Sequence, residues 1–185
     1  MTEEAAAGVR TLFLLRHAKS SWEDSKLKDI DRPLNPRGRK SCKLMGEQMA
    51  ARGVNPAIIL CSPSVRTRET LERLGPVAGL TGEARFDPRL YAADAAGLLQ
   101  CLRELPADIP QILLIGHNPA IQELALMLAR RGRLDVLEQL ERKFPTCALA
   151  QIRLAAADWA NVSASDGALV SFDLPKQLKR QKARL

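Results

Sequence analysis

Leu12-Phe13-Leu14-Leu15-Arg16-His17-Ala18 is the stretch that decides the fold, because a continuous apolar run ends there at two basic side chains. Such a run is typical of a strand buried on both faces of a parallel sheet. A second run, residues 112–115, is followed in the same way by Gly116 and His117. The chain has only these two histidines. Ligands of open α/β sheets bind where strands end, so the sequence predicts one binding site that contains both imidazoles.

Strand and helix patterns alternate along the rest of the chain. Strands are predicted at residues 9–15, 57–61, 112–115, 147–154 and 168–173. Helices are predicted at residues 37–52, 65–74, 93–105, 120–129 and 134–142. This alternation predicts an α/β fold, a single-domain three-layer α/β/α sandwich around a mostly parallel sheet. A turn-rich connection separates the last two strands, which are therefore expected to form a hairpin at one side of the sheet.

Length and charge favour one domain with a basic end. A chain of 185 residues can bury one core. We predict a flexible N-terminus at residues 1–8, a domain at 9–175 and a basic C-terminal tail at 176–185. The tail carries five of the seven net positive charges, which leaves +2 for the other 175 residues. This distribution predicts a solvated, frayed tail, and an aromatic content of 4% argues against nucleic acid as a partner.

Cysteine spacing and hydropathy exclude further classes of protein. Cys42, Cys61, Cys101 and Cys147 lie far apart without a C-x-x-C pair, so we expect four reduced thiols and no metal knuckle. The first residues are acidic where a signal peptide would be basic. No apolar stretch approaches the ~20 residues of a membrane span. These features predict a cytoplasmic protein with no membrane partner.

Basic side chains at the predicted strand ends point to an anionic ligand. Arg16 precedes His17, and a guanidinium binds phosphate oxygens through paired hydrogen bonds. The predicted helix at 65–74 begins just after a strand, so its free N–H groups and Arg66 would face the same edge of the sheet. Arg68 lies about 200° further around that helix and should face elsewhere. A neutral imidazole beside these cations could attack phosphorus.

Four motifs follow one another along the chain. They are Arg16-His17-Ala18-Lys19-Ser20, Asp31-Arg32-Pro33-Leu34-Asn35-Pro36-Arg37-Gly38, Ser62-Pro63-Ser64-Val65-Arg66-Thr67-Arg68-Glu69-Thr70 and Gly116-His117-Asn118-Pro119. Together they resemble the histidine phosphatase superfamily, and within it the small SixA-type phosphohistidine phosphatases. The resemblance spans about residues 9–174 and implies a phosphoglycerate mutase-like fold.

The resemblance also implies a two-step reaction that requires no metal or cofactor. One histidine accepts the phosphoryl group, and water then hydrolyses the phosphohistidine. The implied catalytic residues are His17, the nucleophile, and His117. The implied substrate-binding residues are Arg16, Arg66, Asn35 and Ser62, the last two on motif position alone. The superfamily motif usually has glycine where this chain has Ala18.

The general acid is left open. Asp87 and Asp94 lie in the middle region where mutase-like members carry a glutamate, although Asp94 could equally be a helix N-cap. A site without an acid suits the P–N bond of phosphohistidine, because imidazole has a pKa of about 6.5 and leaves more readily than an alkoxide. We therefore expect a phosphatase of phosphohistidine in a signalling protein. The alternatives are a phosphatase of small phosphorylated metabolites and, from another class, a non-catalytic phosphate-binding module.

Overall fold

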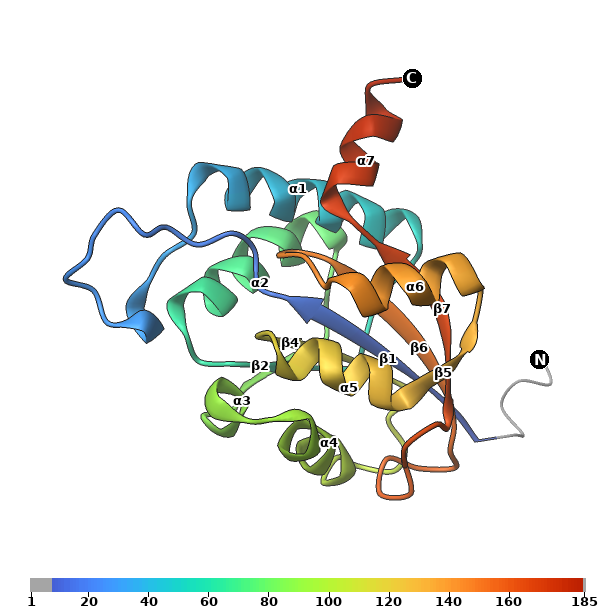
Figure 1. The fold of residues 1–185 in the computed structure, drawn as a ribbon. Coiled ribbons are helices and arrows are strands. Elements are labelled where there is room, and N and C mark those ends of the chain that lie inside the picture. The colour runs from blue at the N-terminus through green and yellow to red at the C-terminus, as the bar shows by residue number, and fades with distance from the viewer. Residues whose placement is uncertain (1–7, 185) are drawn as a thin grey trace.

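A seven-stranded sheet runs through the middle of the molecule, with helices on both of its faces (Figure 1). This computed structural model describes residues 8–184. The strand order is β3-β2-β4-β1-β6-β7-β5. The strands are β1 (Val9–Arg16), β2 (Ile58–Cys61), β3 (Glu83–Phe86), β4 (Gln111–Gly116), β5 (Ala129–Gly132), β6 (Leu149–Ala155) and β7 (Gly167–Asp173).

Most neighbouring strands run parallel. The pairs β3–β2, β2–β4, β4–β1 and β5–β7 are parallel, whereas β6 is antiparallel to both β1 and β7. The helices are α1 (Pro36–Ala51), α2 (Val65–Ala78), α3 (Arg89–Ala92), α4 (Ala95–Arg103), α5 (Ala120–Leu128), α6 (Leu134–Arg142) and α7 (Pro175–Lys182). A short 3-10 helix, η2 (Asp29–Asp31), precedes α1. The predicted α/β sandwich and its antiparallel pair β6–β7 are confirmed.

Alternate residues of the central strand β1 serve the two cores. Leu12 and Leu14 pack in the core that contains the buried residues of α4 and α5. Phe13 and Leu15 pack in the core that contains those of α1 and α2. Side chains alternate across a strand, so a continuous apolar run is needed wherever helices cover both faces. The apolar stretch of β1 therefore fixes it at the centre of the sheet.

The C-terminal segment differs from the predicted frayed tail. Residues 175–182 form α7, which packs on α1 and buries Leu178 to 7% exposure. Lys182 forms an ion pair with Glu47 of α1. Pro175 at the first helical position favours a helix, and Leu178 packs it on α1. The dense positive charge of the segment makes this helix hard to recognise in the sequence. Residues 1–7 of the predicted flexible terminus lie outside the described residues.

Three strand ends meet at one edge of the sheet. In the order β2-β4-β1, Cys61 pairs with Ile115 and Arg16 pairs with Gly116. The backbone N–H of His17 then donates to the carbonyl of Gly116 at 3.0 Å. The residues that follow these strands are therefore brought together, beside the loop that carries η2 (Figure 1). Among residues 8–184, no helix is both long and apolar enough to cross a bilayer.

Candidate active site

His17 is held as a neutral imidazole with one ring nitrogen free. The side chain is only 8% exposed, and its Nδ1 lies 2.8 Å from the carbonyl oxygen of Ala18. A carbonyl can only accept, so Nδ1 carries the proton and the lone pair is on Nε2. Burial lowers the pKa of His17 to about 3, helped by the neighbouring His117 and arginines and opposed by the Ala18 carbonyl. At neutral pH His17 therefore has the protonation state of a nucleophile.

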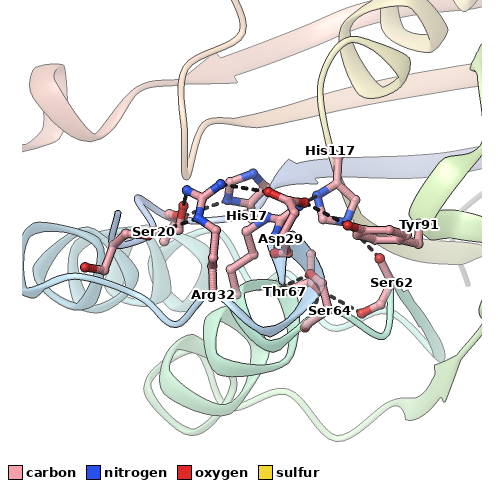
Figure 2. Close-up of polar contacts among 12 residues, drawn as sticks. His17, Ser20, Asp29, Arg32, Ser62, Ser64, Thr67, Tyr91 and His117 are labelled. Atoms are coloured by element: carbon pink, nitrogen blue, oxygen red, sulfur yellow. Dashed lines mark hydrogen bonds and ion pairs between the residues drawn. The ribbon is translucent and has the colours of Figure 1, made fainter. Parts of the chain in front are cut away.

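His117 stands beside His17, with ring centroids 5.2 Å apart (Figure 2). Its Nδ1 lies 3.3 Å from Nη2 of Arg66, and its Nε2 lies 2.8 Å from Oγ of Ser62. A guanidinium only donates, so Nδ1 accepts and Nε2–H donates to the serine. Burial first and Arg66 second lower the pKa of His117 to about 4.

Arg66 enters the site from the first turn of α2. Ser64 caps this helix by accepting from the backbone N–H of Thr67. The Arg66 side chain is nearly buried and donates from Nη1 to the backbone oxygen of Asp29 at 2.5 Å and from Nη2 to its carboxylate at 2.9 Å. The predicted direction of Arg66 agrees with this geometry. Arg68 is exposed and donates to the carbonyl of Pro63, away from the histidines.

Arg16 has an unused donor beside the histidines. Its Nη1 donates to the carbonyl of Phe144 at 2.8 Å, whereas its Nε is buried and has no hydrogen-bond partner among the described residues. Burial and the nearby Arg66 lower the pKa of Arg16 from its ordinary value. A buried donor without a partner is rare in folded proteins, and an oxygen of a bound phosphoryl group would satisfy it.

The two second-rank residues are placed differently. Ser62 is fully buried and contacts His117, as expected of a pocket residue. Asn35 caps α1 instead: its Oδ1 accepts from the N–H of Gly38 at 2.9 Å, and its Nδ2 donates to the carbonyl of Ser20 at 3.3 Å. Both polar atoms of Asn35 are thus used by the backbone. The structure therefore shows Asn35 in a capping role, and its predicted substrate contact stays a prediction.

Two residues that sequence reasoning missed complete the site. The carboxylate of Asp29, on η2, contacts Arg66. It also accepts from the hydroxyl of Tyr91 at 2.7 Å (Figure 2). The ring of Tyr91 meets His117 edge-on at 5.5 Å between centroids. The hydrogen bond from Tyr91 and then the contacts with Arg66 and Arg32 lower the pKa of Asp29 to about 2.

Arg32 holds the loop that carries Asp29. It is nearly buried, and it donates to the Asp29 carboxylate at 2.8 Å, to the Ser20 hydroxyl at 2.5 Å and to the backbone oxygen of Ser21 at 3.0 Å. Its guanidinium also lies 3.1 Å from the ring centroid of Trp22. Sequence signals for these contacts are weak: Asp29 lies in a polar, exposed loop, and Tyr91 is notable only as the single tyrosine of the chain.

Comparison with known proteins places this geometry in a family. The model of the histidine phosphatase superfamily (branch 1) matches residues 12–98. An uncharacterized protein of Mycobacterium tuberculosis is 35% identical over 164 residues, which are 88% of this chain and 100% of that protein. The structure of a proposed phosphohistidine phosphatase SixA from Nakamurella multipartitia is 30% identical, with a TM-score of 0.76 over 91% of this chain and 98% of that one. The chain belongs to the histidine phosphatase superfamily, in its SixA-type group.

One relative of lower sequence identity has a named activity. The phosphohistidine phosphatase SixA of Escherichia coli is 28% identical over 119 residues, which are 63% of this chain and 73% of that protein. These relatives support phosphatase activity for this chain. Its substrate has to be argued from the residues of its own site.

Neither acidic residue singled out in the middle region of this histidine phosphatase faces the histidines. The Asp87 carboxylate is bound by Arg89, at 2.7 Å between Oδ2 and Nη2. Asp94 caps α4 by accepting from the N–H of Gly97 at 2.8 Å. Asp29 is the carboxylate at the site, and its low pKa keeps it ionised at neutral pH. Among the described residues, the pocket of this phosphatase has no carboxyl group placed to donate a proton.

Proposed function

We propose that this histidine phosphatase dephosphorylates phosphohistidine in a signalling protein, through a phosphohistidine intermediate on His17. The observation that carries the proposal is the bond from Nδ1 of His17 to the Ala18 carbonyl, which leaves Nε2 as a free nucleophile inside a cationic pocket. Similarity to proteins named phosphohistidine phosphatase SixA supports the same substrate class.

In the first step, the lone pair of Nε2 of His17 attacks phosphorus, and the P–N bond of the substrate breaks. When the distal nitrogen of the substrate ring is protonated, the ring leaves as neutral imidazole, so no acid has to reach the scissile nitrogen. Arg16 and Arg66 would bind the equatorial oxygens, and the Nε2–H of His117, which donates to Ser62 in this structure, would exchange that contact for a phosphoryl oxygen. These donors would stabilise the charge on the transferring group. In the second step, water attacks phosphorus, the P–N bond to His17 breaks and inorganic phosphate leaves.

Within residues 8–184, no carboxylic acid is placed to protonate a leaving group, which favours this substrate over phosphomonoesters. A serine or sugar alkoxide is a far stronger base than imidazole and requires protonation as it leaves. The ionised Asp29 cannot supply that proton, and Asp87 and Asp94 are held elsewhere. A pocket of this kind is suited to leaving groups that depart without help.

The test is a comparison of kcat/KM for a phosphohistidine peptide with kcat/KM for phosphoserine and sugar phosphates. We expect the phosphohistidine peptide to be preferred by at least about 100-fold, a typical contribution of general acid catalysis. The His17→Ala variant should lose both turnover and acid-labile phosphoenzyme. A preference for sugar phosphates would contradict the assigned substrate, and activity retained in His17→Ala would contradict the mechanism.

A further inference from the structure

A basic groove lies between α1 and α7. Its volume is about 900 Å³, and its walls carry six cationic side chains: Arg37, Lys40 and Lys43 from α1, and Lys176, Lys179 and Lys182 from α7. Glu47 is the one acidic residue among the described residues that line it, and it is paired with Lys182. Within residues 8–184, the other five cations have no carboxylate partner.

The groove shares one lining residue, Arg37, with a second hollow that Arg16 also lines. This second hollow has a volume of about 310 Å³, and Lys19 and Lys143 line it too. Arg16 immediately precedes the proposed nucleophile, His17. A ligand seated between α1 and α7 could therefore extend past Arg37 toward the reacting phosphoryl group without leaving positive surface.

The chemistry of the walls favours a polypeptide over a polyphosphate. Leu44, Pro175 and Ala183 lie among the lysines, whose aliphatic stems are themselves apolar. A nucleic acid would gain from aromatic side chains on which bases stack, and no aromatic residue lines this groove. Acidic side chains alternating with apolar ones, as on one face of an amphipathic helix, match both features of the wall.

We propose that the groove between α1 and α7 docks an acidic amphipathic helix of the protein whose phosphohistidine is hydrolysed. This inference rests on the proposed function, since it assigns the partner of the same active site. Exposed charge pairs raise the rate of encounter and select the partner more than they add raw affinity. The groove is therefore expected to act on kcat/KM for a protein substrate and to leave small substrates unaffected.

The test uses the 185-residue chain and three substrates. Phosphoimidazole reports the active site alone. Two phosphohistidine peptides share the sequence around the phosphorylated residue and continue, through a flexible linker, into an amphipathic helix. One helix carries glutamate and leucine, and the other has glutamine in place of every glutamate. We expect kcat/KM to be roughly five- to tenfold higher for the glutamate peptide, a preference that fades in 0.5 M salt.

Variants of α7 provide a matched comparison. Lys176→Glu with Lys179→Glu reverses two groove residues, whereas Arg180→Glu with Arg184→Glu changes the net charge equally on exposed residues that do not line the groove. The first variant should lose the preference for the glutamate peptide and keep its phosphoimidazole activity. The second should keep both. Lys40→Glu with Lys43→Glu, on the opposite wall, should repeat the loss even if the first variant fails to fold.

Several outcomes would overturn the docking surface. They are equal rates of the wild type on both peptides, equal losses in the groove variant and its charge-matched control, or tighter binding of single-stranded DNA or anionic lipid vesicles than of the glutamate helix. Binding of the unphosphorylated glutamate helix, followed by fluorescence anisotropy, does not depend on catalysis. Failure of the wild type on phosphoimidazole with that binding intact would count against the proposed function and leave the groove supported.

Discussion

His17 and His117 carry their protons on different ring nitrogens because each faces a different partner. The Ala18 carbonyl requires a proton on Nδ1 of His17, whereas the Arg66 guanidinium requires a lone pair on Nδ1 of His117. The two neighbouring imidazoles thus present different atoms: His17 has a free Nε2, and His117 has an Nε2–H that donates to Ser62. The difference arises from backbone and neighbour positions, not from the residue type.

This difference is measurable because the chain has no other histidine. Long-range ¹H–¹⁵N spectra of the ring nitrogens, assigned with His17→Gln and His117→Gln, should show the Nδ1–H tautomer for His17 and the Nε2–H tautomer for His117. Neither ring should become protonated near pH 6.5, because burial lowers the pKa of His17 to about 3 and that of His117 to about 4. An Nε2–H tautomer on His17 would be incompatible with the assigned nucleophile.

The Asp29 carboxylate binds the guanidinium of Arg66, which is proposed to bind the phosphoryl group of the substrate. Replacing it with asparagine removes the ion pair with Arg66 and keeps the shape of the side chain. We expect vanadate, a phosphate mimic, to inhibit Asp29→Asn about two- to fivefold more tightly than the wild type at low salt, the range of an exposed ion pair. The inhibition constant measures this effect.

Asp31→Asn is the matched control, because Asp31 lies on the same turn and has no ion pair among the described residues. It should bind vanadate as the wild type does. Weaker inhibition of Asp29→Asn, together with a lower kcat on phosphomonoesters only, would instead identify Asp29 as a proton donor.

At this scale, the positions of four residues of the candidate site could be predicted from the sequence. Arg16, His17 and His117 follow apolar runs, and Arg66 stands two residues beyond a helix cap, so strand ends and helix geometry place them. Asp29 could not be predicted, because its position depends on how Arg32 folds an otherwise polar loop onto the sheet edge. The substrate contact predicted for Asn35 stays a prediction, because capping and phosphate binding favour the same amide side chain and the structure shows the capping contact.

At the scale of elements, a carboxylate that caps a helix is held by the backbone and is not free to act as an acid or base. Asp94 accepts from Gly97 at the start of α4, so its replacement should lower stability and not turnover. We expect Asp94→Ala to reduce the free energy of unfolding by about 1 kcal/mol, the usual worth of an N-cap, with unchanged kcat/KM on a phosphohistidine peptide. Urea denaturation and steady-state kinetics measure the two quantities.

Asp94→Asn serves as the control, since asparagine caps as well as aspartate. It should unfold at the wild-type urea concentration. A fall in kcat in both variants, without loss of stability, would instead indicate that Asp94 acts as the general acid.

The elements that could be predicted are those with long apolar runs. β1, β4 and α1 are found within one or two residues of the predicted bounds, because buried strands and amphipathic helices have strong periodicity. β3 and β5 could not be predicted: each has four residues, most of them exposed, and exists because its neighbour offers a free edge. Such edge strands depend on tertiary pairing more than on their own sequence.

At the scale of the whole molecule, two buried neutral imidazoles make stability depend on pH. As pH falls below about 6.5, an unfolded chain takes up protons on both rings, whereas the folded protein does not until about pH 4 for His117 and pH 3 for His17. The unfolded state therefore binds more protons in this window, and stability must fall with pH. Each histidine can contribute up to about 1.4 kcal/mol per pH unit.

Thermal or urea unfolding between pH 7 and pH 4 measures this dependence. We expect the free energy of unfolding to decline across the range, and the slope to be smaller in His17→Gln and in His117→Gln than in the wild type. An identical slope in all three proteins would mean that the imidazoles do not remain neutral in the folded state. Below pH 4, protonation of Asp29 adds a loss of the same sign, because its folded pKa is about 2.

The contact between Asp29 and Arg66 also has a consequence for which anions the site accepts. A ligand that binds the Arg66 guanidinium must displace the Asp29 carboxylate. Its net electrostatic gain is therefore the difference between its own attraction to Arg66 and that of one negative charge. A dianionic phosphoryl group is attracted to Arg66 more strongly than the Asp29 carboxylate is, and Arg16 and the N-terminus of α2 add to that attraction. A sulfate ester or a phosphodiester, each with a single charge, gains little. We therefore expect Asp29 to make the site favour dianionic ligands over singly charged ones.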